Sequence, residues 1–208
     1  MNADPTSDAL SLLDWKREVG ELYAWIRAAP DMRAAWRHWQ ETRARLFRQH
    51  PQSPVPPEER GGYTGPHLYD YDPAWSLAAT VESLEPRRLE IVTSNVEAMT
   101  FTRFALAHLT YAGIDVTLEL YWLEGYGGGL FVPFADATSG EETYGAGRYL
   151  LDTVKGADLG ARDGQLVMDF NFAYQPSCAY DPRWTCPLTP PANRLAVAVR
   201  AGERVTEG

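Results

Sequence analysis

Apolar residues near the N-terminus recur at every third or fourth position, which is the spacing of one face of an α-helix. In the first such stretch they are Leu12, Trp15, Val19, Leu22, Tyr23 and Ile26. Asp4 or Ser7 precedes the stretch as a helix cap, and Pro30 ends it. A second stretch, over residues 31–49, carries on one stripe Met32, Trp36, Trp39, Leu46 and Phe47. These patterns predict a helical hairpin over residues 8–50 that packs against the rest of the protein.

A proline-rich connection follows at residues 51–66. Its first part reads PQSPVPPEERGG, with four prolines and a closing pair of glycines. Proline fixes φ and removes a backbone donor, so we expect an irregular segment here. Because strand-like residues begin directly afterwards, we interpret this connection as a strap across the core.

From residue 67 onward the pattern changes to alternation, which is typical of β-strands. Residues 115–123 show it most clearly: one face carries Val116, Leu118, Leu120 and Trp122, and the other carries Thr117, Glu119 and Tyr121. Less regular strands are predicted at 68–72, 76–82, 89–94, 99–109, 130–134, 166–173 and 194–200. About eight strands without intervening helices predict an α+β protein that is mostly β, with an antiparallel β-barrel or sandwich over residues 67–204 behind the helical hairpin.

The size and composition fit one globular domain spanning residues 1–208. Apolar residues make up 45% of the sequence, which is too many for a disordered chain. The formal net charge of -9 repels nucleic acid, so we expect no nucleic-acid partner. Arginines do gather on the second predicted helix, where we interpret them as a solvated face: Arg33, Arg37, Arg43, Arg45 and Arg48.

No apolar run is as long as a membrane span, and the first residues lack the pattern of a signal peptide. We therefore expect a cytoplasmic protein without a membrane partner. The tryptophans of the helical hairpin lead to one further expectation, a surface through which the chain forms a homo-oligomer.

Two segments, residues 127–148 and 169–194, hold most of the polar and unusual residues. Within thirteen residues the first contains Asp136, Thr138, Ser139, Glu141, Glu142, Thr143, Tyr144 and Arg148. Because apolar runs flank these polar groups, we expect a loop that packs onto the sheet, and we take it as a candidate site. The planar guanidinium of Arg148 suits an anionic group of a ligand, and equally the carboxylate of Asp136 or Asp169.

In a regular strand over residues 166–173, Asp169 and Asn171 point to the same face. A carboxylate and a carboxamide in that position need hydrogen-bond partners if they are buried. Arg148 and Tyr144 from the loop are suitable partners, and so is a ligand. The sequence leaves open whether these residues form an internal network or a binding site.

The two cysteines, Cys178 and Cys186, lie eight positions apart in a segment that contains prolines. Three interpretations are open: packed thiols in the reduced state, a disulfide that closes a short loop, and redox or nucleophilic chemistry. No histidine is near them, and the histidines at positions 38, 50, 67 and 108 show no metal-ligand spacing. The sequence therefore predicts no metal site.

Several motifs carry a resemblance to a known family: FVPFADATSGEETYGAGRYL, DFNFAYQPSCAY, CPLTPP, NRL, AGER and SPV at residues 53–55. They resemble the uncharacterised prokaryotic family catalogued as domain of unknown function 1684. The resemblance runs from the tryptophan-rich helix to Arg204. One departure flanks Pro176, where the family pattern has an asparagine and a second proline or similar residue and this chain has Gln175 and Ser177. The resemblance implies a family and no particular activity.

These residues support two classes of function at one pocket, formed by the 135–148 loop and the 169–186 segment. The first is a module that binds a small molecule, anionic if Arg148 holds it. Its predicted ligand-binding residues are Thr138, Ser139, Tyr144, Arg148, Asn171, Tyr174 and Tyr180. The second is an enzyme with the candidate catalytic residues Asp136, Glu142 and Asp169 as general acid or base, or Cys178 as nucleophile. No motif implies a cofactor, and only the barrel-like strand pattern suggests a flavin site similar to that of split-barrel flavoproteins.

Overall fold

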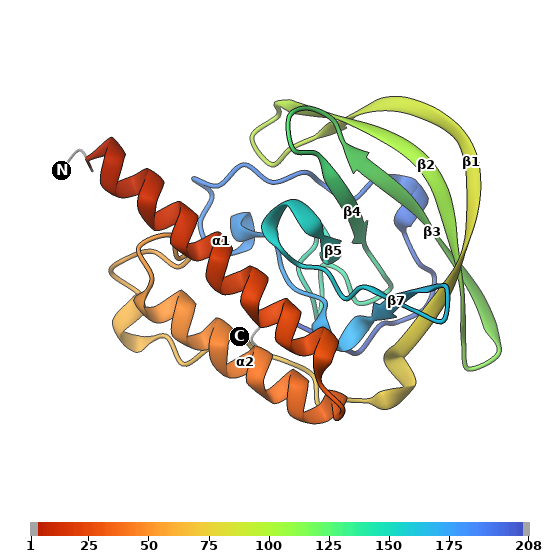
Figure 1. The fold of residues 1–208 in the computed structure, drawn as a ribbon, viewed down its shortest axis with the longest axis horizontal. Helices are drawn as coiled ribbons and strands as arrows, with labels where there is room; N and C mark the ends of the chain where they lie inside the picture. Colours follow the sequence, from red (N-terminus) through yellow and green to blue (C-terminus); the bar gives the residue numbers. More distant parts are fainter. Residues whose placement is uncertain (1–3, 206–208) are drawn as a thin grey trace.

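The fold is known from a computed structural model that describes residues 4–205. Two long helices, α1 (Pro5–Ala28) and α2 (Met32–Gln49), form the predicted hairpin (Figure 1). The side chains of Asp4 and Asp31 cap them by accepting hydrogen bonds from backbone N–H groups in the first turn. Among the described residues, no helix is both long and apolar enough to cross a membrane.

The strands of the described residues form one antiparallel sheet of seven, in the order β5-β4-β3-β2-β1-β7-β6. The strands are β1 (Ser76–Val92), β2 (Ala98–Tyr111), β3 (Ile114–Leu123), β4 (Gly129–Phe134), β5 (Arg148–Asp152), β6 (Ala161–Arg162) and β7 (Gln165–Asp169). Figure 1 shows the long strands β1, β2 and β3 curving around the C-terminal part of the chain. The predicted α+β class is confirmed.

The predicted barrel or sandwich is wrong, because the sheet stays open between β5 and β6, its two edge strands. The strand expected at 166–173 ends at Asp169, and the chain then makes a 3-10 turn over Phe170–Phe172. Beyond the turn, Tyr174 exchanges backbone hydrogen bonds with Tyr149 of β5, at 2.8 and 3.0 Å, as an isolated bridge. One bridge of this kind does not extend a strand ladder. The flavin interpretation rested on a barrel, so it loses its structural basis.

Four other predicted strands need correction, and the sequence pattern did not predict β5 and β6. The strands predicted at 76–82 and 89–94 are parts of one strand, β1, which continues past Pro86 and ends at Val92. The strand tolerates this proline because its register with β2 shifts between Ser83 and Arg87, where the ladder is already interrupted. Residues 68–72 and 194–200 are irregular, with only isolated bridges at Leu68 and Arg194.

The core lies between the helical hairpin and the curved sheet. The turn after β7 fills this space: the ring of Phe172 contacts Trp39 of α2 at 5.6 Å between centroids. On the other side, Phe170 contacts Phe134 of β4 at 5.1 Å. Aromatic side chains are suited to such a layer because each one buries a large apolar area. The end of β7 therefore joins the hairpin to the sheet.

The arginines of α2 do not all form the predicted solvated face. Arg43 is only 12% exposed and makes an ion pair with Glu203, whose side chain is 0% exposed. Arg45 lies two positions further along the same helix, is 49% exposed, and pairs with Glu18 of α1. Trp39 is also fully buried, so it does not belong to a surface. A homo-oligomer through the helical hairpin stays a prediction.

Candidate functional site

Arg148, the predicted anion anchor, is fully buried at the start of β5. Its guanidinium donates hydrogen bonds to the backbone carbonyl oxygens of Val199 (2.8 Å), Glu203 (3.1 Å) and Ala201. It also lies 3.4 Å from the carboxylate of Asp136. The C-terminal segment of the chain therefore occupies most of the donors that a ligand would need.

The carboxylate of Asp136 holds the 135–148 loop together. It accepts hydrogen bonds from the hydroxyl groups of Thr138 at 2.9 Å and Ser139 at 3.2 Å. It also accepts the backbone N–H of Val199 at 2.6 Å. An internal network is present here, but it joins Arg148 to Asp136. Asp169 bonds to Asn171 and not to Arg148 or Tyr144, which the sequence had suggested as its partners. Whether any of these residues also binds a ligand stays a prediction.

Glu142 lies at the surface of the same loop. Its carboxylate accepts hydrogen bonds from the guanidinium of Arg200, the shortest at 2.7 Å, and from the hydroxyl of Tyr69 at 2.9 Å. The hydrogen bonds from Arg200 lower the pKa of Glu142, and the one from Tyr69 acts in the same direction. A carboxyl group with a lowered pKa is ionised at neutral pH, which makes it a poor general acid.

Asp169 and Asn171 contact each other, although not through strand alternation. Asp169 ends β7 and accepts hydrogen bonds from the backbone N–H of Asn171 at 3.0 Å and from its side-chain amide at 2.8 Å. The same amide group of Asn171 pairs with the backbone of Asp72, at 2.8 and 2.9 Å. The two side chains thus bind the turn after β7 to the segment before β1.

Burial raises the pKa of Asp169, and its hydrogen bonds from Asn171 oppose that shift. A raised carboxyl pKa stabilises the fold fully below the ordinary carboxyl pKa, and this contribution is lost as pH rises through the raised value. We therefore expect Asp169→Asn to gain stability relative to the native protein as pH rises from about 3.9 to 7. Urea unfolding of both proteins across this range measures the difference. A constant difference at all pH values contradicts the prediction.

The predicted ligand-binding tyrosines of the two segments contact other parts of the protein. The hydroxyl of Tyr180 donates to Glu203 at 3.0 Å, and the ring of Tyr174 packs against Tyr149 at 5.8 Å between centroids. The hydroxyl of Tyr144 lies 3.7 Å from the sulfur of Cys178. Ligand-binding roles for these tyrosines stay predictions.

Sequence reasoning missed the buried ion pair of Arg43 and Glu203. Glu203 also accepts the backbone N–H of Gln175 at 2.7 Å, so the pair joins α2 to two C-terminal segments. The guanidinium of Arg43 lies over the rings of Trp39 and Phe47, at 4.9 and 4.7 Å from their centroids. Arg43 is four positions from each of these aromatic residues, which is helical spacing. This position on the apolar stripe was the signal that could have identified it.

Two adjoining cavities form a groove, which we call the Lys155 groove. Its polar part has a volume of about 250 Å³ and is lined by Trp15, Lys16, Gln52, Ser177, Trp184 and Cys186, among others. Its apolar part, of about 210 Å³, is lined by Met99, Phe101, Leu123, Phe131, Asp152 and Pro187. Both parts share the side chains of Val154, Lys155 and Thr185. The groove takes residues from the second predicted segment and none from the 135–148 loop.

The position of Lys155 follows from a tight turn after β5. Backbone hydrogen bonds of 2.9 and 3.0 Å join Asp152 and Ala157 across this turn. Gly156 completes it with a φ of 85°, and a side chain there would meet the backbone of Gly20 in α1. A glycine is needed because the left-handed conformation and the contact with α1 both disfavour a Cβ atom. Lys155 is thereby held at the junction of the two cavities.

The charge in the groove is positive, in contrast to the net charge of -9 for the chain. Both lysines of the sequence, Lys16 and Lys155, line its polar part. Lys155 lies 3.7 Å from the carboxylate of Asp152, and Lys16 makes no ion pair within residues 4–205. Burial raises the pKa of Asp152, while Lys155 acts to lower it. Sequence spacing could not predict this site, because the two lysines are far apart in the chain.

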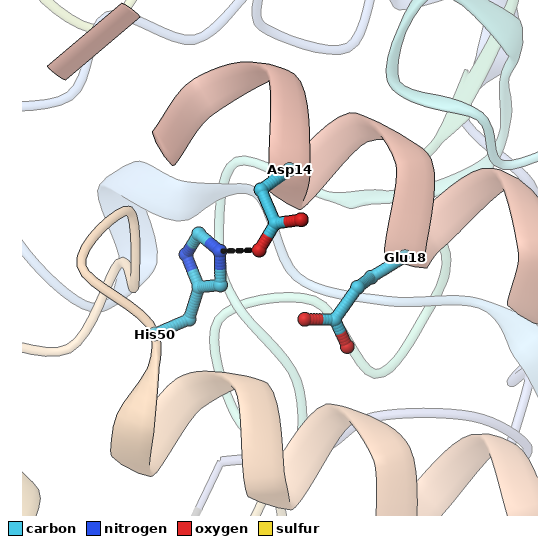
Figure 2. A group of neighbouring side chains, drawn as sticks. All are labelled: Asp14, Glu18 and His50. Carbon is cyan, nitrogen blue, oxygen red and sulfur yellow. Dashed lines mark ion pairs between the residues drawn. The ribbon is translucent and has the colours of Figure 1, made fainter. Parts of the chain in front are cut away.

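A second group of side chains has the composition of a metal site. Figure 2 shows Asp14 and Glu18 on α1 facing His50, which follows α2. Nδ1 of His50 accepts the backbone N–H of Gln52 at 3.1 Å, so the neutral ring carries its proton on Nε2. Nε2 faces Asp14 at 3.5 Å and has no free lone pair for a metal. Since Glu18 is also paired with Arg45, we interpret this group as a link between α1 and the connection after α2.

The chain is similar to known proteins over most of its length. The model of a family described as "Protein of unknown function (DUF1684)" matches residues 61–204. The solution NMR structure of an uncharacterised protein from Haloarcula marismortui is 36% identical in sequence, with a TM-score of 0.58. The match covers 80% of this chain and 90% of that chain. No curated protein matches the sequence.

Proposed function

We propose a function on the premise that this chain belongs to the DUF1684 family, whose description names no activity. The protein binds a small organic anion in the Lys155 groove. The charged group of the ligand lies at Lys155 and Lys16, and its apolar body lies in the apolar part. The observation that carries the proposal is that both lysines of an acidic chain line one cavity, which continues into an apolar one.

The chemistry of the two parts favours an amphiphilic ligand. Lysine presents a compact positive charge that suits a carboxylate or a phosphate. The side chains of Phe101, Phe131 and Leu123 offer an apolar wall without hydrogen-bond donors. Ligand pockets usually have volumes of about 300–1,000 Å³, so neither part is large enough alone and a ligand of ordinary size spans both. A medium-chain or aromatic carboxylate has the required shape and charge.

An enzyme that acts on the same kind of anion is a second candidate. The observation that favours it is the carboxyl group of Asp152, which lines the apolar part beside Lys155. A buried carboxyl group with a raised pKa in a cavity has the properties of a general acid or base. Mass spectrometry of the bound compound after incubation separates the two candidates, because only an enzyme changes the mass of its ligand.

Replacing Lys155 by glutamine should weaken the binding of decanoate by roughly tenfold or more, because the carboxylate loses its charged partner. The affinity of the native protein should also fall as salt rises, since Lys155 is 46% exposed. Isothermal titration with decanoate measures both effects, and decanol serves as the neutral analogue.

The matched control for this experiment is Arg17→Gln. It removes the same charge from the protein, on the same helix as Lys16, but Arg17 pairs with Asp14 on the surface. This variant should bind decanoate like the native protein. Equal losses in both variants, or equal affinities for decanoate and decanol, contradict the proposal.

A further inference from the structure

The two cysteines are neighbours in space. Both are free and buried, and they lie eight positions apart in the chain. The backbone N–H of Cys178 donates to the sulfur of Cys186 at 3.3 Å. Their segment folds back on itself through a 3-10 turn at Ser177–Ala179 and a turn that ends at Trp184. Local backbone geometry therefore brings the two thiols together.

The groups around the two sulfur atoms favour a negative charge on the pair. The N–H of Cys178 points at the sulfur of Cys186, and the hydroxyl of Tyr144 lies 3.7 Å from the sulfur of Cys178. The cationic side chain of Lys155 lines the same cavity as Cys186. Hydrogen-bond donors and nearby cations stabilise a thiolate, which is the reactive form of cysteine.

The two cysteines differ in pKa. The neighbouring Cys186 thiol lowers the pKa of Cys178 to about 6, against the opposing effect of burial. The sulfur of Cys178 in turn raises the pKa of Cys186, and burial raises it further. The pair therefore loses its first proton at Cys178, while Cys186 keeps its own. Thiol–disulfide exchange needs this combination, an attacking thiolate and a second thiol that resolves the product.

The pair lies beside the groove, which Ser177, the neighbour of Cys178, lines together with Cys186. Cys186 lines the polar part of the groove, and the side chain of Cys178 is 9% exposed against 1% for Cys186. Ser94, just beyond β1, anchors Cys186 through two hydrogen bonds, of 2.9 and 3.1 Å. Cys178, in contrast, belongs to a single 3-10 turn. The thiolate can thus move toward the resolving thiol without disturbing the sheet.

We infer that Cys178 and Cys186 form a redox-active dithiol that closes reversibly to a disulfide by exchange with a small-molecule disulfide. The thiolate of Cys178 attacks the S–S bond of the reagent, which releases one small thiolate and leaves a mixed disulfide. The thiol of Cys186 then loses its proton and attacks the sulfur of Cys178, which releases the second small thiolate. The cysteines give up two electrons, which the reagent gains. This inference does not depend on the ligand of the groove.

The test is to equilibrate the native protein in buffers with increasing ratios of oxidised to reduced glutathione. Samples are quenched with acid, alkylated in denaturant and weighed by intact mass spectrometry. We expect one transition, from a protein alkylated at both cysteines to a protein alkylated at neither. The mass of the second form should be two hydrogen atoms below that of the unmodified protein with two thiols. Peptide mapping should place the new bond between Cys178 and Cys186.

Two variants identify the order of attack. Cys186→Ser should accumulate a glutathione adduct at Cys178, because the resolving thiol is missing. Cys178→Ser should react more slowly than Cys186→Ser, since it retains only the thiol with the raised pKa. Two alkylated cysteines at every buffer ratio, or glutathione adducts on both cysteines of the native protein, overturn the inference. These outcomes are read from the native protein, so they hold even if a variant fails to fold.

Discussion

The Arg43→Met variant should lose about 3–5 kcal/mol of unfolding free energy, because the carboxylate of Glu203 is left buried without its charged partner. The side chain of Glu203 is 0% exposed, and that of Arg43 is 12% exposed. Methionine fills much of the space beside Trp39 and Phe47, so the loss reports the missing charge more than a cavity. For a chain of this size the melting temperature should fall by roughly 10 °C. Urea unfolding measures the free energy directly.

Arg45→Met is the matched control, two positions away on the same helix. Arg45 also makes an ion pair, with Glu18, but its side chain is 49% exposed. Exposed pairs of this kind contribute about 0–1 kcal/mol, so this variant should unfold almost like the native protein. Similar losses in both variants contradict the prediction, because they would show that burial of the Arg43 pair makes no difference.

The second large effect is expected for Arg148→Met. This change leaves the carboxylate of Asp136 without its cation and removes the donors to the carbonyl groups of Val199, Ala201 and Glu203. Removing one partner of a buried pair costs about 3–5 kcal/mol, and unsatisfied buried carbonyls add to this. Arg148→Lys should also be destabilised, because one ammonium group cannot reach the same set of acceptors. Thermal and urea unfolding test both variants.

This prediction also decides between the two interpretations of Arg148. A variant that keeps native stability but no longer binds an anion would identify Arg148 as a ligand anchor. Loss of stability identifies it as the centre of an internal network. Arg200→Met is the control, because Arg200 pairs with Glu142 on the surface and its side chain is 61% exposed. Its unfolding free energy should change by less than about 1 kcal/mol.

The two buried arginines have a common consequence for the architecture. Arg43 comes from the helical hairpin and Arg148 from the sheet, and both bind the segment around Glu203. This short irregular segment therefore connects the two layers of the protein. Loss of either arginine should loosen the attachment of the C-terminal segment, which explains why both variants are expected to rank among the most destabilised.

Local patterns in the sequence were sufficient for the helices and for most of the strands. Apolar spacing and capping side chains determine where α1 and α2 form, because the contacts involved lie within a few residues of each other. Alternation located β3, and the burial of Leu118 and Leu120 agrees with it. The same strand also departs from its own alternation. Tyr121 shares its predicted face with the polar residues Thr117 and Glu119 but is fully buried, because β4 joins the sheet there and pairs Phe131 with it.

Contacts between distant segments decided whether the sheet closes, which charged residues are buried and where the groove forms. Whether a sheet closes depends on how its two edges meet, and here β7 ends at Asp169 before its continuation can pair along β5. The burial of Arg43 depends on Glu203, which lies 160 positions away in the chain. The Lys155 groove likewise combines residues of α1, the turn after β5 and the cysteine segment. The sequence alone thus determined most of the local elements, the family resemblance and the presence of reactive or charged residues in particular segments. Only the tertiary structure decided which of them meet, because burial and charge pairing depend on segments that sequence spacing does not relate.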